Sequence, residues 1–316
     1  MKKAIIVGHT GQDGTCLSSL LLSHGYEVTG FSTNSVSENK YSICKIDIRK
    51  YTEVQNAIKN ILPNEVYFLA AIHQSSADIH IEDGELFQKS FDLNVKAYIN
   101  FLEAIRLYSP KTKIFYAASS HIFGNPSTSP QNESTPLNPN CIYGITKTAG
   151  IRIGHFYKEN HAIFSSVGIF YNHESPLRES KYVSKKIVET VVAIKQGKKN
   201  ELILGNLESQ IDWGYAPDYM KAVYQMMRQE KSDDFIISSG ELHTIKDFAE
   251  GVFDYLGLDC KKYVKVNPSL ITKKQKQNLF GNNRKIQSAT GWTPSVSFNE
   301  LIKILVDAEI KKDGSK

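Results

Sequence analysis

The stretch "KAIIVGHTGQDG", residues 3–14, decides the fold. Its first half is a short apolar run typical of a buried strand, and its second half spaces Gly8, Gly11 and Gly14 three residues apart. Apolar residues then recur at helical spacing through residues 14–24. A strand that enters a helix through a glycine-rich turn predicts a dinucleotide site, with the pyrophosphate at the helix N-terminus. The alternative is a glycine turn that serves only close packing of strand and helix.

Apolar strands and helices continue to alternate beyond this turn. Strands and helices in alternation predict an α/β fold with a Rossmann-type, doubly wound parallel sheet of about seven strands. From about residue 170 the segments become shorter and more polar, around helices expected near 181–197 and 244–257. We therefore expect an NAD-binding domain at 1–170, with later strands returning to its sheet, and a smaller C-terminal substrate lobe at 171–316. The expected strands are 27–32, 41–47, 65–71 and 113–119, and the expected helices begin near 52 and 93.

Composition excludes several classes of protein. The 316 residues are 41% hydrophobic and 22% charged, and no apolar run approaches the about 18 residues of a membrane span. The N-terminus lacks the long apolar core of a signal peptide. The four cysteines are widely spaced without a CxxC pair, which argues against a disulfide framework or a metal site and favours the cytoplasm.

The net charge of +5 is mild, and no basic stripe interleaved with aromatic residues predicts nucleic-acid binding. The clearest local cluster of positive charge consists of Lys273, Lys274 and Lys276. These lysines form either a solvated face or the rim of a site for an anionic ligand.

The choice between NAD and NADP depends on the residues after the second strand. The sequence there, "FSTNSVS", places Thr33 where an acidic residue or an arginine is expected, and offers no cation for a 2′-phosphate. NAD is therefore favoured. Asp47, after the third strand, either accepts a hydrogen bond from the adenine amino group or caps the next helix. Further cofactor contacts are expected at Gln12, Asp13, Ile48, Leu69, Ala70 and Ala71.

The sequence "YGITK" places Tyr143 and Lys147 one helical turn apart, so that both side chains point the same way. A neighbouring ammonium group stabilises a phenolate, so we expect a lowered pKa at Tyr143 and a role for it as general base towards an alcohol. Ser119, at the end of the strand "KIFYAAS", is placed to donate to the oxygen that becomes a carbonyl. YxxxK alone is common on exposed helices, but here it follows a dinucleotide loop.

Together, the glycine turn, the serine strand and YxxxK resemble the extended short-chain dehydrogenase/reductases over essentially the whole chain. Three longer stretches resemble the GDP-mannose 4,6-dehydratases: "GHTGQDGTCLSSLLLSHGYEV", "NHESPLRESKYVSKKI" and "LGNLESQIDWGYAPDYM". The resemblance implies a GDP-sugar substrate in the C-terminal lobe, with Asn172 near the diphosphate and Lys186 near the guanine. The full set of substrate residues that it implies is Asn172, Glu174, Ser175, Arg178, Val183, Lys186 and Asn206.

Three departures from the dehydratases bear on activity. Where their strand reads threonine, serine, glutamate, this chain reads Ser119, Ser120, His121. Their arginine pair for NADP is replaced by Thr33 and Asn34, and the arginine before their "DWG" is replaced by Ile211.

In the dehydratases, a ketone formed at C4 acidifies the C5 proton, which the glutamate removes as water leaves C6. Loss of general base catalysis costs about 10²–10⁴-fold, enough to stop the reaction at the ketone. We therefore interpret His121 as the mark of a lost dehydration step, with Ser120 and His121 as catalytic or substrate contacts. A neutral imidazole is also a competent base, so dehydration assisted by His121 stays open, as do reduction and epimerisation at C4.

Within the family the pattern most resembles the bacterial GDP-D-glycero-D-manno-heptose 4-dehydrogenases of capsule heptose modification. That resemblance implies oxidation at C4, retention of NADH on the protein, and a second substrate that reoxidises it. A rival from another class is a non-catalytic dinucleotide sensor. The superfamily also implies a homo-oligomer that pairs through the helices around Asn94 and Tyr143. The segment 33–42 differs from the one that helps to form tetramers in the dehydratases, so the sequence does not decide between a dimer and a tetramer.

Overall fold

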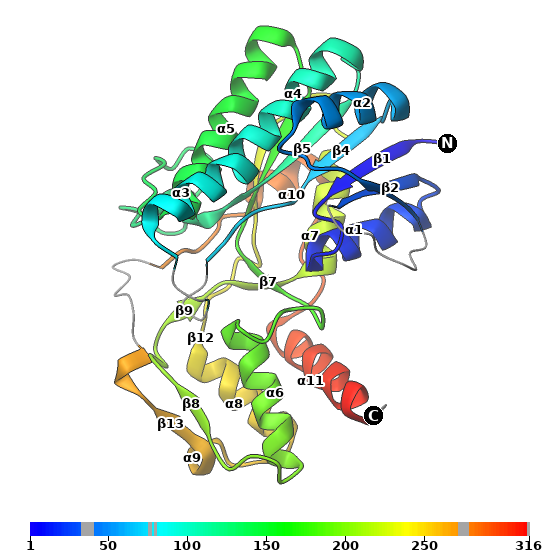
Figure 1. Ribbon diagram of the computed structural model, residues 1–316. Helices are drawn as coiled ribbons and strands as arrows, with labels where there is room; N and C mark the ends of the chain where they lie inside the picture. The colour runs from blue at the N-terminus through cyan, green and yellow to red at the C-terminus, as the bar shows by residue number, and fades with distance from the viewer. Residues whose placement is uncertain (33–40, 75–77, 79–80, 271–277, 315–316) are drawn as a thin grey trace.

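The computed structural model describes residues 1–32, 41–74, 78, 81–270 and 278–314 (Figure 1). Thr33 and Asn34, most of the segment 33–42, and the lysines at 273, 274 and 276 lie outside these ranges.

A single sheet of seven parallel strands organises the described chain. The strand order reverses direction beside β1, with β2 and β3 on one side and β4, β5, β6 and β11 on the other, which confirms the predicted doubly wound sheet. In chain order the strands are β1 (Lys3–Val7), β2 (Glu27–Ser32), β3 (Ser42–Lys45), β4 (Glu65–Phe68), β5 (Lys113–Ser119), β6 (Ser165–Phe170) and β11 (Asp234–Ile237).

Helices cover both faces of this sheet and exclude water from it (Figure 1). One face is buried under helices that follow β3, β4 and β5, and the other under the first helix and two from the C-terminal half. The first layer contains α2 (Tyr51–Ile61), α3 (Asp83–Phe91), α4 (Ala97–Tyr108) and α5 (Ile142–His161). The second contains α1 (Gln12–Ser23), α7 (Ala216–Met226) and α10 (Arg284–Thr290).

A π-helical turn, Asp92–Lys96, joins α3 to α4 in one continuous helical run. Its Asn94 is fully buried, and the Asn94 carbonyl oxygen Oδ1 accepts from the Ile72 backbone N–H at 2.9 Å. The Asn94 amide also donates to the Thr146 hydroxyl of α5 at 3.0 Å. The turn therefore fixes the segment after β4 against the helix that carries Tyr143.

A third apolar core lies below the sheet in Figure 1, within the C-terminal half of the chain. We propose this core as the substrate lobe of residues 171–316, from which α7, β11 and α10 return to the sheet. Its elements are α6 (Val183–Lys195), α8 (Ile245–Tyr255), α9 (Cys260–Tyr263) and α11 (Phe298–Gly314). The short strands are β7 (Asn172–Glu174), β8 (Leu202–Leu204), β9 (Gln210–Ile211), β10 (Trp213–Tyr215), β12 (His243–Thr244) and β13 (Val264–Val266).

Substitution of two helical glycines by alanine would test how closely α5 is packed on the sheet. A Cβ at Gly150 would lie 2.1 Å from the buried Tyr116 hydroxyl, whereas a Cβ at Gly84 on α3 would meet nothing within 4 Å. We expect Gly150→Ala to lower the free energy of unfolding by about 1–3 kcal/mol through overpacking. Gly84→Ala, the matched control, should raise it by up to about 1 kcal/mol through backbone entropy. Urea denaturation measures both, and equal effects would contradict this packing.

Candidate active site

Two of the three glycines in the first turn are required by packing. Gly8 has φ +90°, and a Cβ there would lie 2.8 Å from the Ala70 backbone nitrogen. A Cβ at Gly14 would lie 2.3 Å from the Gly8 carbonyl oxygen. Packing alone therefore accounts for Gly8 and Gly14, as the alternative interpretation of the turn requires.

Gly11 has no such packing reason. It is exposed at the N-cap of α1, and a Cβ there would meet only the Gly8 carbonyl oxygen at 3.5 Å, an ordinary contact. A glycine that the chain itself does not need leaves room for a ligand to approach the backbone N–H groups of the helix N-terminus. The turn thus fits a dinucleotide pyrophosphate.

The other predicted cofactor residues lie at the same edge of the sheet. The backbone N–H groups of Leu69 and Ala70 both donate to the Val7 carbonyl oxygen at 3.0 Å, which holds the end of β4 beside the glycine turn. Ala71 continues this segment and is half-buried. Ile48 is buried in the core that lies under α2 and α4.

Asp47 does not cap α2, contrary to one of the two predicted roles, because the helix begins at Tyr51 with Lys50 as its N-cap. The Asp47 carboxylate instead accepts from the Arg49 backbone N–H at 3.1 Å and from the Arg49 guanidinium at 2.8 Å. These hydrogen bonds from Arg49 lower the pKa of Asp47. An acceptor role towards adenine stays a prediction.

Tyr143, Lys147 and Ser119 come together as the YxxxK spacing predicts. Both helical residues lie on α5, and the Lys147 Nζ is 5.6 Å from the Tyr143 ring centroid. Lys147 is fully buried and donates from Nζ to the Ala117 carbonyl oxygen at 2.7 Å, which attaches α5 to β5. Ser119, the last residue of β5, is hydrogen-bonded to the Tyr143 side chain.

The expected lowering of the Tyr143 pKa is not found in the protein alone. Burial raises the pKa of Tyr143, the charges of Tyr182 and Asp13 add to this effect, and the hydrogen bond with Ser119 opposes it. Burial also lowers the pKa of Lys147 to about 7, so that the ammonium is only partly charged at neutral pH. Desolvation therefore outweighs the favourable pairing that the spacing predicts.

His121 lies in a short 3₁₀ turn, Ser120–Phe123, directly after β5. Its Nδ1 is 3.7 Å from the Cys141 Sγ, and its ring centroid is 5.8 Å from that of Tyr143. Ser120 is buried in the same turn. His121 thus lies beside the Tyr143 ring, whereas the Ser120 side chain is buried.

His73 is a site residue that sequence analysis missed. It follows β4, and its ring is 4.7 Å from the Tyr143 ring and 5.8 Å from the His121 ring, measured between centroids. On its other face it stacks with Tyr182 at 6.4 Å. Burial lowers the pKa of His73 to about 4, with the charge of His121 as the next cause, so this imidazole is neutral at physiological pH. Its position two residues after Ala71, at the carboxyl edge of β4, was the available signal.

A cavity of about 1180 Å³ opens in front of these rings. It reaches from Tyr143, His73 and His121 to the exposed Asn206 of the C-terminal lobe. The lining residues are Ile72, His73, Gln74, Asp83, Leu86, Phe87, Ser90, His121, Gly124, Asn125, Asn140, Cys141, Ile142, Tyr143, Ile145, Asn206, Glu208, Ser209, Gln210, Asn278 and Leu279.

The remaining predicted substrate residues do not line this cavity. Asn172 and Lys186 are exposed, and Val183 opens α6. Glu174 is buried and forms an ion pair with Arg178 at 3.2 Å. Burial raises the Glu174 pKa, although Arg178 opposes the shift.

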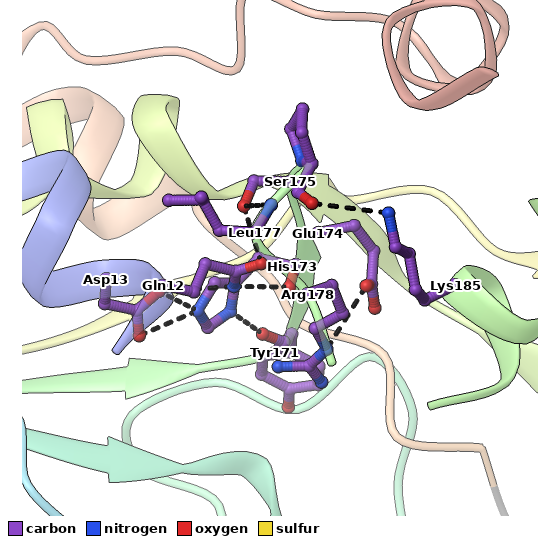
Figure 2. A network of polar contacts seen from close by, with 10 residues as sticks. Gln12, Asp13, Tyr171, His173, Glu174, Ser175, Leu177, Arg178 and Lys185 are labelled. Carbon is purple, nitrogen blue, oxygen red and sulfur yellow. Dashed lines mark hydrogen bonds and ion pairs between the residues drawn. The ribbon is translucent and has the colours of Figure 1, made fainter. Parts of the chain in front are cut away.

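β7 and Ser175, the residue that follows it, are attached to the first turn of α1 (Figure 2). Gln12 donates to the His173 carbonyl oxygen at 3.1 Å and accepts from the Ser175 hydroxyl at 2.8 Å. Asp13 forms an ion pair with the His173 ring at 2.9 Å. The predicted cofactor residues Gln12 and Asp13 therefore contact the predicted substrate segment directly.

Two negative findings apply to the described part of the chain. It contains no group of three or more histidine, cysteine or carboxylate side chains arranged to hold a metal ion. None of its helices combines the length and apolarity needed to cross a bilayer.

Enzymes of the nucleotide-sugar class are among the solved structures that share this fold. The putative epimerase of Burkholderia cenocepacia J2315 has the same fold, with a TM-score of 0.85 at 18% identity over 98% of both chains. The dTDP-glucose 4,6-dehydratase of Bacillus anthracis, solved with NAD, gives a TM-score of 0.83 at 19% identity over 99% of this chain and 98% of that one.

The sequence places the chain within one family of that class. The profile of the family "GDP-mannose 4,6 dehydratase" matches residues 5–305. GDP-mannose 4,6 dehydratase 2 of Arabidopsis thaliana is 35% identical over 98% of this chain and 87% of its own length. GDP-mannose 4,6-dehydratase of Vibrio cholerae is 29% identical over 98% of this chain and 94% of its own length. The chain belongs to the GDP-mannose 4,6-dehydratase family.

A substitution at Gly11 distinguishes an effect on NAD binding from an effect on the stability of the fold. We expect Gly11→Ala to leave the melting temperature unchanged, because its Cβ has room, and to weaken NAD binding about tenfold or more by displacing the pyrophosphate. Gly14→Ala, the comparison variant, should lower the melting temperature. Calorimetric titration with NAD and thermal melting measure both properties. Parental NAD affinity in Gly11→Ala would contradict the cofactor assignment.

Substitutions of two tyrosines on α5 test the assignment of Tyr143 as the group that takes the substrate proton. Tyr143→Phe should remove most alcohol oxidation, since no other hydroxyl takes the substrate proton, and Ser119→Ala should cost about 10²-fold as one lost donor. Tyr157→Phe is the matched control on the same helix, because its hydroxyl donates to Glu103 at 2.9 Å. Single-turnover hydride transfer is the measurement, and near-parental rates in Tyr143→Phe would show the assignment to be wrong.

Proposed function

We propose that the protein oxidises the C4 hydroxyl of a GDP-sugar to a ketone with NAD as hydride acceptor. Family membership supports the GDP-sugar, and the exposed Gly11 turn supports the dinucleotide. The resemblance described above favours GDP-D-glycero-D-manno-heptose as the substrate and capsule polysaccharide synthesis as the setting. The four free cysteines agree with a cytoplasmic enzyme.

The residues around Tyr143 supply the proton chemistry of an oxidation. The phenolate form of Tyr143 takes the proton of the C4 hydroxyl, while Ser119 holds the sugar oxygen by hydrogen bonding. Lys147, fixed to Ala117, positions Tyr143, and the protonated form of Lys147 stabilises the negative charge of that phenolate. NAD, when bound, supplies the hydride acceptor. The proton then leaves to water in the cavity, so the chain itself is unchanged after each turnover.

The observation that favours oxidation over dehydration is the identity of the side chains beside Tyr143. The resemblance implies a glutamate at position 121, and the chain has His121 there, in contact with Cys141. The second imidazole, His73, has a pKa of about 4, which makes it a weak base for a C5 proton at neutral pH. Water elimination thus lacks a carboxylate base at the position where the family has one.

Dehydration at C6 is a second candidate because His73 lies beside His121. Two imidazoles next to Tyr143 supply a proton acceptor for C5 and a proton donor for the departing C6 oxygen. Membership of the GDP-mannose 4,6-dehydratase family agrees with this candidate, whereas the histidine at position 121 argues against it. A non-catalytic sensor is disfavoured, since Tyr143, Lys147 and Ser119 are all retained and packed together.

We also propose that two copies pair through α4 and α5. Leu107 on α4 and Phe156 on α5 are large apolar side chains that are 46% and 53% exposed, and a partner at these helices would cover them. Whether two such pairs assemble further depends on the segment 33–42.

The product distinguishes the two candidate reactions. An oxidation that is not followed by return of the hydride to the sugar leaves NADH on the protein, so turnover stops until a second substrate or exchange of the cofactor removes that hydride. We expect one equivalent of 4-keto sugar, lighter by two hydrogens, without an added oxidant, and reduced cofactor on the protein. Mass spectrometry of the sugar and the near-ultraviolet absorbance of reduced nicotinamide are the measurements. Continuous formation of a product lighter by water would establish the dehydratase instead.

A further inference from the structure

The ring of His173 is bonded at both of its nitrogens (Figure 2). Nδ1 lies 2.8 Å from the Tyr171 carbonyl oxygen, and Nε2 lies 2.9 and 3.1 Å from the two carboxylate oxygens of Asp13. A carbonyl oxygen and a carboxylate only accept hydrogen bonds, so both ring nitrogens must donate. A neutral imidazole has one N–H, and the geometry therefore requires the imidazolium.

The surroundings of Asp13 favour the carboxylate that this argument assumes. Gln12 donates from Nε2 to the Asp13 Oδ1 at 3.3 Å. Burial raises the pKa of Asp13, but the charge of His173 and its hydrogen bond outweigh burial, and the net shift is downwards. Burial likewise lowers the pKa of His173, but the charge and hydrogen bonds of Asp13 and the bond to Tyr171 outweigh it and raise the pKa.

This ion pair joins two segments that are 160 residues apart in the sequence. On one side, Gln12 and Asp13 begin α1, whose N-terminal N–H groups face the dinucleotide site. On the other side, β7 leads into Ser175 and Arg178, and the Arg178 guanidinium lies 3.6 Å from the centroid of the Tyr182 ring. The Tyr182 ring in turn stacks on His73. A series of contacts thus runs from the first turn of α1 to His73 in the wall of the cavity.

We propose that His173, as a fixed imidazolium, is a positioning residue that couples the dinucleotide site to the GDP-sugar site. The inference rests on the proposed function, because it takes Gln12 and Asp13 as the cofactor side and Ser175 and Arg178 as the substrate side. Dinucleotide binding orders residues 11–14, the ion pair orders residues 173–178, and GDP then binds a segment that is already in place. By linkage, GDP tightens dinucleotide binding by the same factor.

The coupling has a defined pH range. The charged or titratable groups that face His173 are Asp13 from α1, Glu174 from β7, Arg178 after β7, and Tyr219 from α7. The pKa of His173 in the folded protein is raised above its ordinary value of 6.5. The ion pair is therefore fully formed below pH 6.5 and is lost as the pH rises through the raised pKa. The Asp13 pKa is lowered, so the pair fails on the acid side only as the pH falls through that value.

The test measures the affinity for GDP by calorimetry, in the protein freed of dinucleotide and in the same protein saturated with NAD. We expect NAD to tighten GDP binding about tenfold in the parent. His173→Asn and Asp13→Asn should reduce this factor to about one. His155→Asn is the matched control, because His155 forms a similar pair with Asp234 at 2.7 Å away from both sites, and it should keep the parental factor.

A measurement on the parent protein avoids any dependence on the folding of variants. In long-range ¹H–¹⁵N spectra, the two ring nitrogens of an imidazolium resonate close together, and those of a neutral ring lie far apart. We expect the His173 signal, assigned by its absence in His173→Asn, to be that of an imidazolium at pH 7.

The possible outcomes distinguish a failure of this inference from a failure of the proposed function. A neutral His173 ring at pH 7, or variants that bind both ligands more weakly with an unchanged coupling factor, would overturn the inference and leave a merely structural pair. A parent that binds NAD and GDP independently would overturn it while leaving the proposed function intact. A parent that binds neither NAD nor GDP would instead refute the proposed function.

Discussion

The parallel direction of all seven strands is the constraint on which the site depends. Because neighbouring strands run the same way, their carboxyl ends meet at one edge of the sheet, where connecting segments are free of the hydrogen-bond ladder. Gly8 follows β1, His73 follows β4, Ser120 and His121 follow β5, and Asn172 follows β6 by two residues. Segments that are far apart in the sequence thus lie at one edge of the sheet.

Burial sets the chemistry of the groups at this edge. Lys147, His73 and His173 all lose water, yet they reach different charge states because their partners differ. Lys147 donates to the uncharged Ala117 carbonyl oxygen, and burial lowers its pKa to about 7. Burial lowers the pKa of His73 to about 4, so its ring stays neutral, whereas the charge and hydrogen bonds of Asp13 raise the pKa of His173. The same desolvation therefore has opposite net effects on the pKa values of His73 and His173.

The sequence was sufficient for whatever depends on local pattern. The glycine turn, the alternation of strands and helices, and the YxxxK spacing predicted the sheet and the contact between Tyr143 and Lys147. Pattern did not predict the Asp13–His173 pair, because a contact across 160 residues leaves no local periodicity. The pKa of Tyr143 was predicted in the wrong direction, since spacing reports the neighbouring charge but not the loss of water. Asp47 was assigned as a possible cap from its position alone, and Arg49 competes for it.

The central claim is that hydride leaves the sugar at C4 and does not return to it. The most direct measurement follows deuterium from a GDP-sugar labelled at C4, with the product and cofactor analysed by NMR spectroscopy after a single turnover. The proposed oxidation predicts deuterium on the nicotinamide ring and none in the sugar. Deuterium at C6 of a product that has lost water would contradict this account, and would show that His121 and His73 together perform the elimination.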